Sequence, residues 1–244
     1  MTFTFLGTRG YIDARTPRHR RHSALLVAHR GGRVMIDCGE DWMGRVGHLR
    51  PQAILVTHAH PDHAGGLREG SPCPVYATPD AWREMGRFAI APRRRRIIRC
   101  RHARTIGGIT FEAFGVVHSL RAPAVGYRIA AGGASVFYVP DVLAIPERAA
   151  ALGGVRLYIG DGASIVRPIV RRRGRRRFGH ASIRAQLAWC RAERVTSAVF
   201  THCGSQIVAR DGRSEARVVA LGDTLGVDTR VAHDGMTIRV TART

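Results

Sequence analysis

Short apolar or alternating stretches recur along the chain and predict β-strands. They are rich in valine, isoleucine and phenylalanine and are bounded by turn glycines, which is typical of buried or half-buried strands. The predicted strands cover residues 2–6, 24–29, 33–37, 53–57, 109–117, 136–139, 155–159, 197–201, 229–232 and 237–240. Helical patterns between them predict helices over 79–88, 145–152, 182–194 and 214–226. Strands outnumber helices early and alternate with them later, so we expect an α/β fold in which outer helices cover sheets.

Length and composition favour one cytoplasmic domain. The 244 residues can bury a full core, and no linker-like stretch or repeat divides them, so a single domain over 1–244 is expected. No stretch reaches the roughly 18 consecutive apolar residues that a membrane span needs, and residues 1–5 lack the charged start of a signal peptide. The five cysteines are widely spaced and form no CxxC pair, which suits a reducing compartment.

The segment 57–63, with the sequence THAHPDH, carries the strongest chemical signal. It places three histidines and one aspartate directly after the apolar residues 53–56, as if a buried strand ended in metal ligands. Imidazole and carboxylate together suit zinc, manganese or iron. Four donors on one short loop exceed what a tetrahedral ion takes from a single segment, so two divalent metal ions are expected, zinc before manganese or iron.

Three further donors follow the same pattern, since each lies at or just past the end of an apolar run. His118, Asp141 and His202 follow 116–117, 136–140 and 198–201, respectively. In isolation His118 or Asp141 is more typical of a turn. Strand ends gather on one rim of a sheet, however, so the complete set can meet in space. The candidate metal ligands are His58, His60, Asp62, His63, His118, Asp141 and His202.

The formal charge of +21 predicts an anionic partner. The chain has 39 basic residues against 18 acidic ones, and every basic residue is an arginine. Arginine binds phosphate through a planar, two-pronged guanidinium, and a net positive field concentrates polyanions. A phosphate-containing substrate, with nucleic acid as one possibility, is therefore an expected partner. The oligomeric state stays open, with a homodimer among the alternatives.

Together these residues resemble the metallo-β-lactamase-fold hydrolases over nearly the whole chain. The HxHxDH run is followed by a strand-end histidine, aspartate and histidine, and Asp37 is similar to an early aspartate of that superfamily. The resemblance implies an αββα sandwich. It also implies that His58, His60 and His118 hold one metal, that Asp62, His63 and His202 hold the second, and that Asp141 bridges them. Common dizinc β-lactamases have a cysteine where this chain has Asp141, which counts against antibiotic hydrolysis.

Within that superfamily the chain resembles the ribonuclease Z-like and phosphoribosyl cyclic phosphodiesterase branch. The similar motifs are the segments 6–10 (LGTRG), 21–23 (RHS), 179–182 (GHAS) and 233–236 (HDGM), with Asp161 after 157–160. The resemblance implies that His180, steadied by Asp161, protonates the leaving oxygen. We also expect Asp62 to orient the attacking water. The candidate catalytic residues are therefore Asp62, His180 and Asp161. Only 22 residues separate His118 from Asp141, so the tRNA-clamping arm of long-armed ribonuclease Z is absent.

Two arginine tracts are candidate phosphate contacts. The first comprises Arg93, Arg94, Arg95, Arg96, Arg99, Arg101 and Arg104, and the second comprises Arg171, Arg172, Arg173, Arg175, Arg176 and Arg177. Each tract could instead be a solvated loop. For the first tract the two interpretations are balanced, whereas the second ends close to His180 and favours substrate binding. Few aromatic residues are interleaved, so contacts to backbone phosphates are expected rather than base stacking.

The sequence thus predicts a dinuclear metal-dependent phosphodiesterase that acts on RNA or DNA. Small cyclic phosphodiesters are the second choice, on motif similarity, and other hydrolases of this fold, including thioester-cleaving ones, share the same seven donors. A function of a different class is also possible from the sequence, that of a non-catalytic, arginine-rich nucleic-acid-binding protein. The intact donor set argues against it, because a decayed site should have lost ligands.

Overall fold

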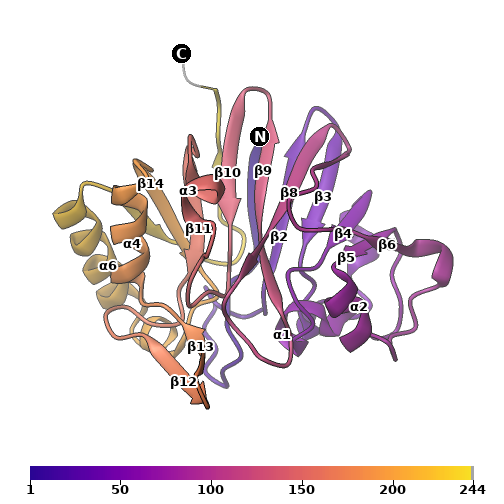
Figure 1. Cartoon of the computed structure of the whole chain (residues 1–244), viewed down its shortest axis with the longest axis horizontal. Helices are drawn as coiled ribbons and strands as arrows, with labels where there is room; N and C mark the ends of the chain where they lie inside the picture. The colour runs from indigo at the N-terminus through magenta and orange to yellow at the C-terminus, as the bar shows by residue number, and fades with distance from the viewer. Residues whose placement is uncertain (243–244) are drawn as a thin grey trace.

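Two seven-stranded sheets pack face to face in the computed structural model, which describes residues 1–242 (Figure 1). In spatial order the first sheet contains β16 (Thr237–Arg239), β1 (Thr2–Gly7), β2 (Ala24–His29), β3 (Gly32–Ile36), β4 (Ala53–Leu55), β5 (Val75–Ala77) and β6 (Arg95–Ile97). The second sheet contains β15 (Asp228–Val231), β14 (Ser197–Thr201), β11 (Leu157–Asp161), β10 (Ala134–Tyr138), β9 (Ala124–Ala131), β8 (Ile109–Val116) and β7 (Arg104–Ile106).

Helices cover the outer faces of both sheets, so the expected αββα architecture is confirmed. Figure 1 shows α1 and α2 beside the first sheet and α4 and α6 outside the second. The α-helices are α1 (Pro61–Ala64), α2 (Pro79–Glu84), α3 (Arg148–Leu152), α4 (Ile183–Ala192), α5 (Ser205–Val208) and α6 (Asp211–Leu225). Short 3₁₀ turns are η1 (Glu40–Trp42), η2 (Val46–Leu49), η3 (Gly65–Leu67) and η4 (Pro92–Arg94).

Three apolar clusters account for the layers. The central one lies between the sheets and contains Phe3, Phe111 and Tyr127, all with 0% of their surface exposed. The second packs the second sheet against its helices, where Ile183 and Leu187 form the inner face of α4. The third lies outside the first sheet, under α1 and α2. Because both faces of each sheet are covered, central strands such as β4 are buried on both faces, whereas the edge strands β6, β7 and β16 stay largely exposed.

Strand direction brings the candidate donors to one edge of the molecule. In the first sheet β3, β4, β5 and β6 run parallel. In the second, β10, β11, β14 and β15 run parallel, and β8 has the same direction because both β8 and β10 are antiparallel to β9. The carboxyl ends of parallel strands meet at one edge of a sheet, which is where α/β proteins place their sites.

Most predicted strands are present, and the second arginine tract has a definite structure. The tract is not a loop: it forms a two-stranded antiparallel hairpin of β12 (Ile169–Arg173) and β13 (Arg176–His180). The predicted helix over 79–88 ends earlier, at Glu84, although Thr78 caps its start by accepting a hydrogen bond from the backbone amide of Ala81 at 3.2 Å. No helix among residues 1–242 is long and apolar enough to cross a membrane. The single domain over 1–244 stays a prediction.

Candidate metal centre and acid–base pair

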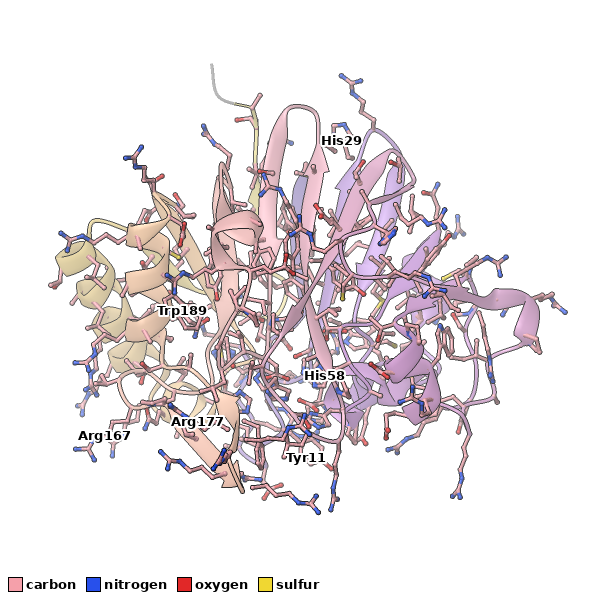
Figure 2. The ribbon with its side chains drawn as sticks, in the orientation of Figure 1. Tyr11, His29, His58, Arg167, Arg177 and Trp189 are labelled. Carbon is pink, nitrogen blue, oxygen red and sulfur yellow. The ribbon has the colours of Figure 1, made fainter. Side chains whose placement is uncertain are left out.

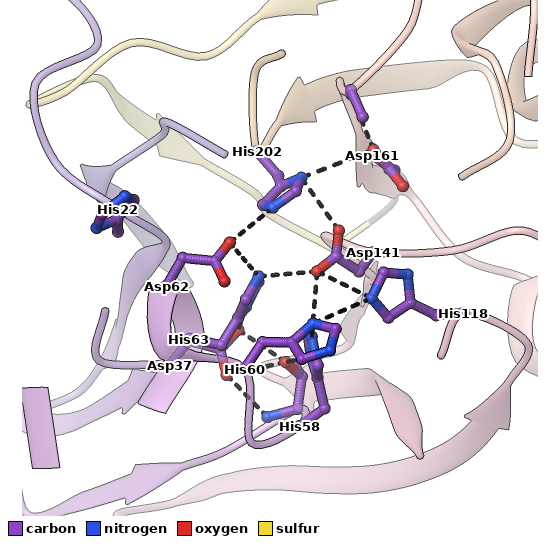
Figure 3. Close-up of polar contacts among 12 residues, drawn as sticks. His22, Asp37, His58, His60, Asp62, His63, His118, Asp141, Asp161 and His202 are labelled. Atoms are coloured by element: carbon purple, nitrogen blue, oxygen red, sulfur yellow. Dashed lines mark hydrogen bonds and ion pairs between the residues drawn. The ribbon is translucent and has the colours of Figure 1, made fainter. Parts of the chain in front are cut away.

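The seven predicted donors come together at the carboxyl ends of the strands (Figure 3). They form two groups, in each of which the ligand atoms lie within 4.8 Å of one another. One group is His58, His60, His118 and Asp141, and the other is Asp62, His63, Asp141 and His202. Asp141 belongs to both. The segment after β4, the start of α1 and the ends of β8, β10 and β14 therefore supply one cluster, although its members are up to 144 residues apart, from His58 to His202.

Asp141 is the centre of this cluster. Its Oδ2 lies 2.8 Å from Nε2 of His63 and 3.3 Å from Nε2 of His58. Its Oδ1 lies 3.1 Å from Nδ1 of His202. The carboxylate is 3% exposed and its two oxygens face different histidines. Such a group can bridge two cations.

In three histidines, Nδ1 is engaged in a hydrogen bond on the side away from the cluster. This orients each ring so that Nε2 points into the cluster. Nδ1 of His63 donates to Oδ2 of Asp37 at 2.8 Å, and Nδ1 of His118 donates to the carbonyl of Gly179 at 3.1 Å. Nδ1 of His58 lies 3.1 Å from the hydroxyl of Thr57, which in turn donates to Asp37. We assign a proton to Nδ1 in all three rings, so Nε2 of each ring points into the cluster and can bind a cation there once it carries no proton.

The backbone at two of these positions is in the left-handed region. Asp37 has φ +62° and His202 has φ +51°, a backbone conformation that residues other than glycine adopt infrequently. Neither is explained by a local turn glycine. Strain of this kind persists only where surrounding structure maintains it, and it gathers at functional sites. Four arginines elsewhere share this backbone conformation, but Asp37 is fully buried beside His63 and His202 is itself a donor, so two of the six such residues lie at the cluster.

The donor set fits bound divalent cations. Nε2 of His63, Oδ1 of Asp141 and Nδ1 of His202 are buried without an aligned hydrogen-bond partner among the described residues. Nε2 of His58 lies only 2.9 Å from Nδ1 of His60, so two ring nitrogens converge on one point. Burial holds the pKa of His58 well below its usual range, and burial together with His118 lowers the pKa of His60 to about 4. Both rings are therefore neutral, as metal ligands must be.

The second donor group, formed by Asp62, His63, Asp141 and His202, is electrostatically suited to positive charge. Burial alone would lower the pKa of His202, but the carboxylates of Asp141 and Asp62 overcome it and raise that pKa to about 9. Burial likewise opposes protonation of His63, yet Asp62, Asp141 and Asp37 raise its pKa well above the usual range. Carboxylates that stabilise a proton on these rings also stabilise a metal ion in its place.

His180 and Asp161 form an acid–base pair beside the metal donors. Nδ1 of His180 donates to Oδ2 of Asp161 at 2.8 Å and lies 3.3 Å from Oδ1 of Asp141. Burial would lower the pKa of His180, but the charge of Asp161, with help from Asp141, raises it to about 11. Because Nδ1 is engaged, Nε2 is the atom left for a substrate. His180 keeps 20% of its side chain exposed, whereas Asp161 has none.

Sequence reasoning missed the residue that holds Asp161. Gln186 is fully buried on α4, and its side chain accepts a hydrogen bond from the Asp161 amide at 2.9 Å and donates to the Asp161 carbonyl at 2.8 Å. The Asp161 carboxylate also accepts from the amides of Val142 and Ala163, at 3.0 and 2.8 Å. A lone glutamine on an amphipathic helix carries no signal of this role.

A buried arginine of the LGTRG segment, Arg9, organises the loop that follows β1. Arg9 is 2% exposed and forms an ion pair with Asp41 at 3.0 Å, while Asp41 accepts from the amide of His22 at 2.9 Å. Burial and the charge of Arg9 lower the pKa of His22 to about 4. This loop carries Tyr11, which is 65% exposed and lies at the same end of the molecule as His58 (Figure 2). The LGTRG motif includes Arg9, but nothing in the sequence indicates that its side chain is buried.

The hairpin of β12 and β13 sorts the second arginine tract onto two faces. Ile169 pairs with His180, Arg171 with Phe178, and Arg173 with Arg176. Directly paired residues share a face and successive residues alternate. Arg171, Arg173 and Arg176 therefore lie on the face of His180, whereas Arg172 and Arg177 lie on the other and Arg175 lies in the turn. Gly179, with φ +128°, approaches Ile169 so closely that a Cβ would lie 2.0 Å from its carbonyl oxygen.

Parts of the chain are similar to a known protein family and to curated proteins. A family model described as a β-lactamase superfamily domain matches residues 32–203. Ribonuclease Z of Bradyrhizobium diazoefficiens is 42% identical over 69 residues, which are 26% of this chain and 22% of that protein. Ribonuclease Z of Methanopyrus kandleri is 38% identical over 72 residues, 28% of this chain and 25% of that protein. The matched stretches thus span a quarter or less of these relatives.

Solved structures share the fold over nearly the whole chain. The metallo-β-lactamase fold protein YhfI from Bacillus subtilis has a TM-score of 0.72 at 17% identity and covers 97% of this chain and 98% of that one. A diphosphatase from the PhnP family has a TM-score of 0.70 at 21% identity, with coverage of 97% and 96%. The short form of human tRNase Z has a TM-score of 0.64 at 18% identity, with coverage of 98% and 99%. At these identities the likeness establishes the fold.

Proposed function

The chain belongs to the metallo-β-lactamase superfamily, and from this premise we propose that it is a metal-dependent phosphodiesterase whose substrates are RNA or DNA. The observation that carries the proposal is the position of His180. This candidate acid lies at the end of an arginine hairpin and, at the same time, 3.3 Å from the central carboxylate of the metal donors. Groups for binding phosphate, for donating a proton and for holding cations thus converge.

Each part of the site has a role in this proposal. His58, His60, His118 and Asp141 would hold one divalent cation, with zinc the first choice, and Asp62, His63, Asp141 and His202 a second. Bound cations of this kind neutralise phosphoryl charge and make water a nucleophile near neutral pH. The carboxylate of Asp62, which accepts from His202 at 3.0 Å, would also orient the attacking water.

His180 would supply the proton that the leaving oxygen needs. With Nδ1 bound to Asp161, the protonated ring presents the Nε2 proton to the substrate, and Asp161 stabilises the charge until the proton is transferred. Asp161 is a positioning residue in this scheme, since its oxygens are all engaged by protein groups. The ribonuclease Z matches support a nucleic-acid substrate.

The two faces of the hairpin supply a test of the nuclease proposal. We expect the triple variant Arg171→Ser, Arg173→Ser, Arg176→Ser to raise KM for single-stranded RNA or DNA. It should also reduce the slope of log binding constant against log salt by about 2, because each phosphate that an arginine neutralises contributes about 0.7 to that slope. Turnover of bis(p-nitrophenyl) phosphate should hardly change. Steady-state kinetics and fluorescence anisotropy over a salt series measure both effects.

The other side of the same hairpin provides the matched control. The variant Arg172→Ser, Arg175→Ser, Arg177→Ser removes the same charge from the other face and the turn, so it should shift KM and the salt slope much less. Equal effects of the two variants would mean that only net charge matters. No effect of either would make the arginines solvated residues without a role in binding.

A small cyclic phosphodiester is the second candidate substrate. The segment between His118 and Asp141 favours it, because this segment is too short for a tRNA-binding arm. β9 and β10 of the second sheet take up most of its 22 residues. In the part of the chain that the structure describes, nothing there extends out as a tRNA-clamping arm. If neither hairpin variant affects nucleic-acid binding while cyclic nucleotides are hydrolysed, this second candidate replaces the first.

A further inference from the structure

The first arginine tract lines a groove that shares no residue with the metal donors. The groove lies between β6, at one edge of the first sheet, and β7, at the corresponding edge of the second, and is open to solvent with a volume of about 810 Å³. Figure 1 shows β6 on the flank of the sandwich farthest from α6. Arg95, Arg96 and Arg99 line the groove from the first sheet, and His102 and Arg104 line it from the side of the second.

The charge in this groove is unbalanced. None of the residues that line it is acidic. Arg96, Arg99 and Arg104 are exposed and form no ion pair with any residue between 1 and 242 that the structure describes. Their neighbour Arg101, which is not part of the lining, is paired with Glu112 and Glu147 at 3.0 and 2.9 Å. Acidic partners are therefore available to the tract but lie outside the groove, so no carboxylate of the described residues offsets the positive charge that lines it.

Two of these arginines are held in place by the backbone. Arg95 donates to the carbonyls of Ile90 and Phe88 at 3.0 and 3.2 Å. Arg96 donates to the carbonyls of Arg93 and Arg95 at 2.8 and 2.9 Å. Side chains already ordered lose less conformational entropy when a ligand binds. Arg95 and Arg96 are thus already ordered before any anion binds.

Protection of the sheet edges does not account for the arrangement. Each of β6 and β7 is paired on one side only, and charged side chains on such edges prevent pairing with other chains. That role does not require arginines from both sheets to line one groove. An apolar surface is present as well, because Ile97 is 50% exposed and Tyr76 and Ile106 also line the groove. Sugar and base faces can pack on such a surface, whereas an inorganic polyphosphate cannot use it.

We propose that this groove is a second binding site for a nucleic-acid strand, separate from the catalytic centre, that holds the sugar–phosphate backbone without reading sequence. Guanidinium groups contact phosphates along the strand, and the apolar side chains contact its sugars and bases. Binding here requires no catalysis. The proposal of this binding site is therefore independent of which phosphodiester the metal centre cleaves.

The test compares the full chain with two triple variants. The groove variant, Arg96→Ser, Arg99→Ser, Arg104→Ser, removes the three exposed guanidinium groups of the groove that form no ion pair with any described residue. Arg33→Ser, Arg191→Ser, Arg239→Ser is the control, because these exposed arginines lie outside both the groove and the hairpin and remove the same charge. Binding of fluorescein-labelled oligouridylate is followed by anisotropy over a salt series, and turnover of bis(p-nitrophenyl) phosphate is measured alongside.

The groove variant should bind oligouridylate roughly 10-fold to 100-fold more weakly at physiological salt, with a slope against log salt smaller by about 2. The control should change little, and both variants should turn over the chromogenic diester like the unaltered chain. Unchanged binding in the groove variant, or an equal loss in the control, would overturn the proposal. So would inorganic polyphosphate binding as tightly as oligouridylate and losing as much affinity in the groove variant, since the groove would then be a polyphosphate site.

Discussion

Replacing His60 by alanine should remove at least one of two bound cations per chain and nearly all turnover. Nδ1 of His60 converges with Nε2 of His58 at 2.9 Å and with Nε2 of His118 at 3.4 Å, so its loss opens the ligand shell of the first group. Three imidazoles and a shared carboxylate make a complete site, and two imidazoles do not. Elemental analysis of protein purified without chelator measures the metal, and hydrolysis of bis(p-nitrophenyl) phosphate measures the activity.

His48→Ala is the matched control, because His48 is an exposed histidine on η2 and belongs to neither metal group. It should keep the full metal content and activity. Circular dichroism of both variants separates loss of metal from loss of fold. A His60→Ala protein that retains two cations per chain and normal turnover would show that the first group does not hold a metal through this residue.

His180→Ala should slow the hydrolysis of diesters with poor leaving groups by roughly 10² to 10⁴, the usual contribution of a general acid. The ring is protonated, because Asp161 and Asp141 outweigh the effect of burial and raise its pKa to about 11. A nitrophenolate leaves without a proton, so bis(p-nitrophenyl) phosphate should be affected much less than RNA. Metal content should not change, because His180 is not among the seven proposed ligands, although its ring also lies within reach of Asp141 and His202.

The contrast between leaving groups identifies the role of His180. Equal slowing of both substrates would point to general damage of the site, and loss of metal would make His180 a ligand. His180→Gln serves as a second variant, since it keeps a hydrogen-bonding side chain but cannot deliver a proton in the same way. It should show the same dependence on the leaving group as His180→Ala.

The donors could be predicted from the sequence because strand ends are visible in it. An apolar run followed by histidine or aspartate marks the carboxyl end of a buried strand, and parallel strands bring those ends together. His118, Asp141 and His202 follow this pattern, and the structure places all three beside the HxHxDH segment. Their role as ligands remains our proposal, although their proximity is a property of the fold.

Features that depend on burial of a single polar side chain could not be predicted. Nothing in the sequence indicates that Gln186, or Arg9 within the LGTRG motif, is buried. Only the packing of α4 and of the N-terminal loop reveals them as fully or almost fully buried. The β12–β13 hairpin was missed because arginine-rich strands lack apolar alternation. β6 was missed for the same reason, since two of its three residues are arginines.

Titration of zinc into chelator-stripped protein, with phosphodiester hydrolysis followed at each addition, tests the proposed two-cation phosphodiesterase most directly. Asp141 is shared by two donor groups, so we predict that little activity appears with the first equivalent and that full activity develops as the second binds. Hydrolysis by the metal-free protein, or full activity at one equivalent, would contradict the two-cation site. Stoichiometric zinc uptake without hydrolysis of RNA, DNA or small diesters would contradict the phosphodiesterase.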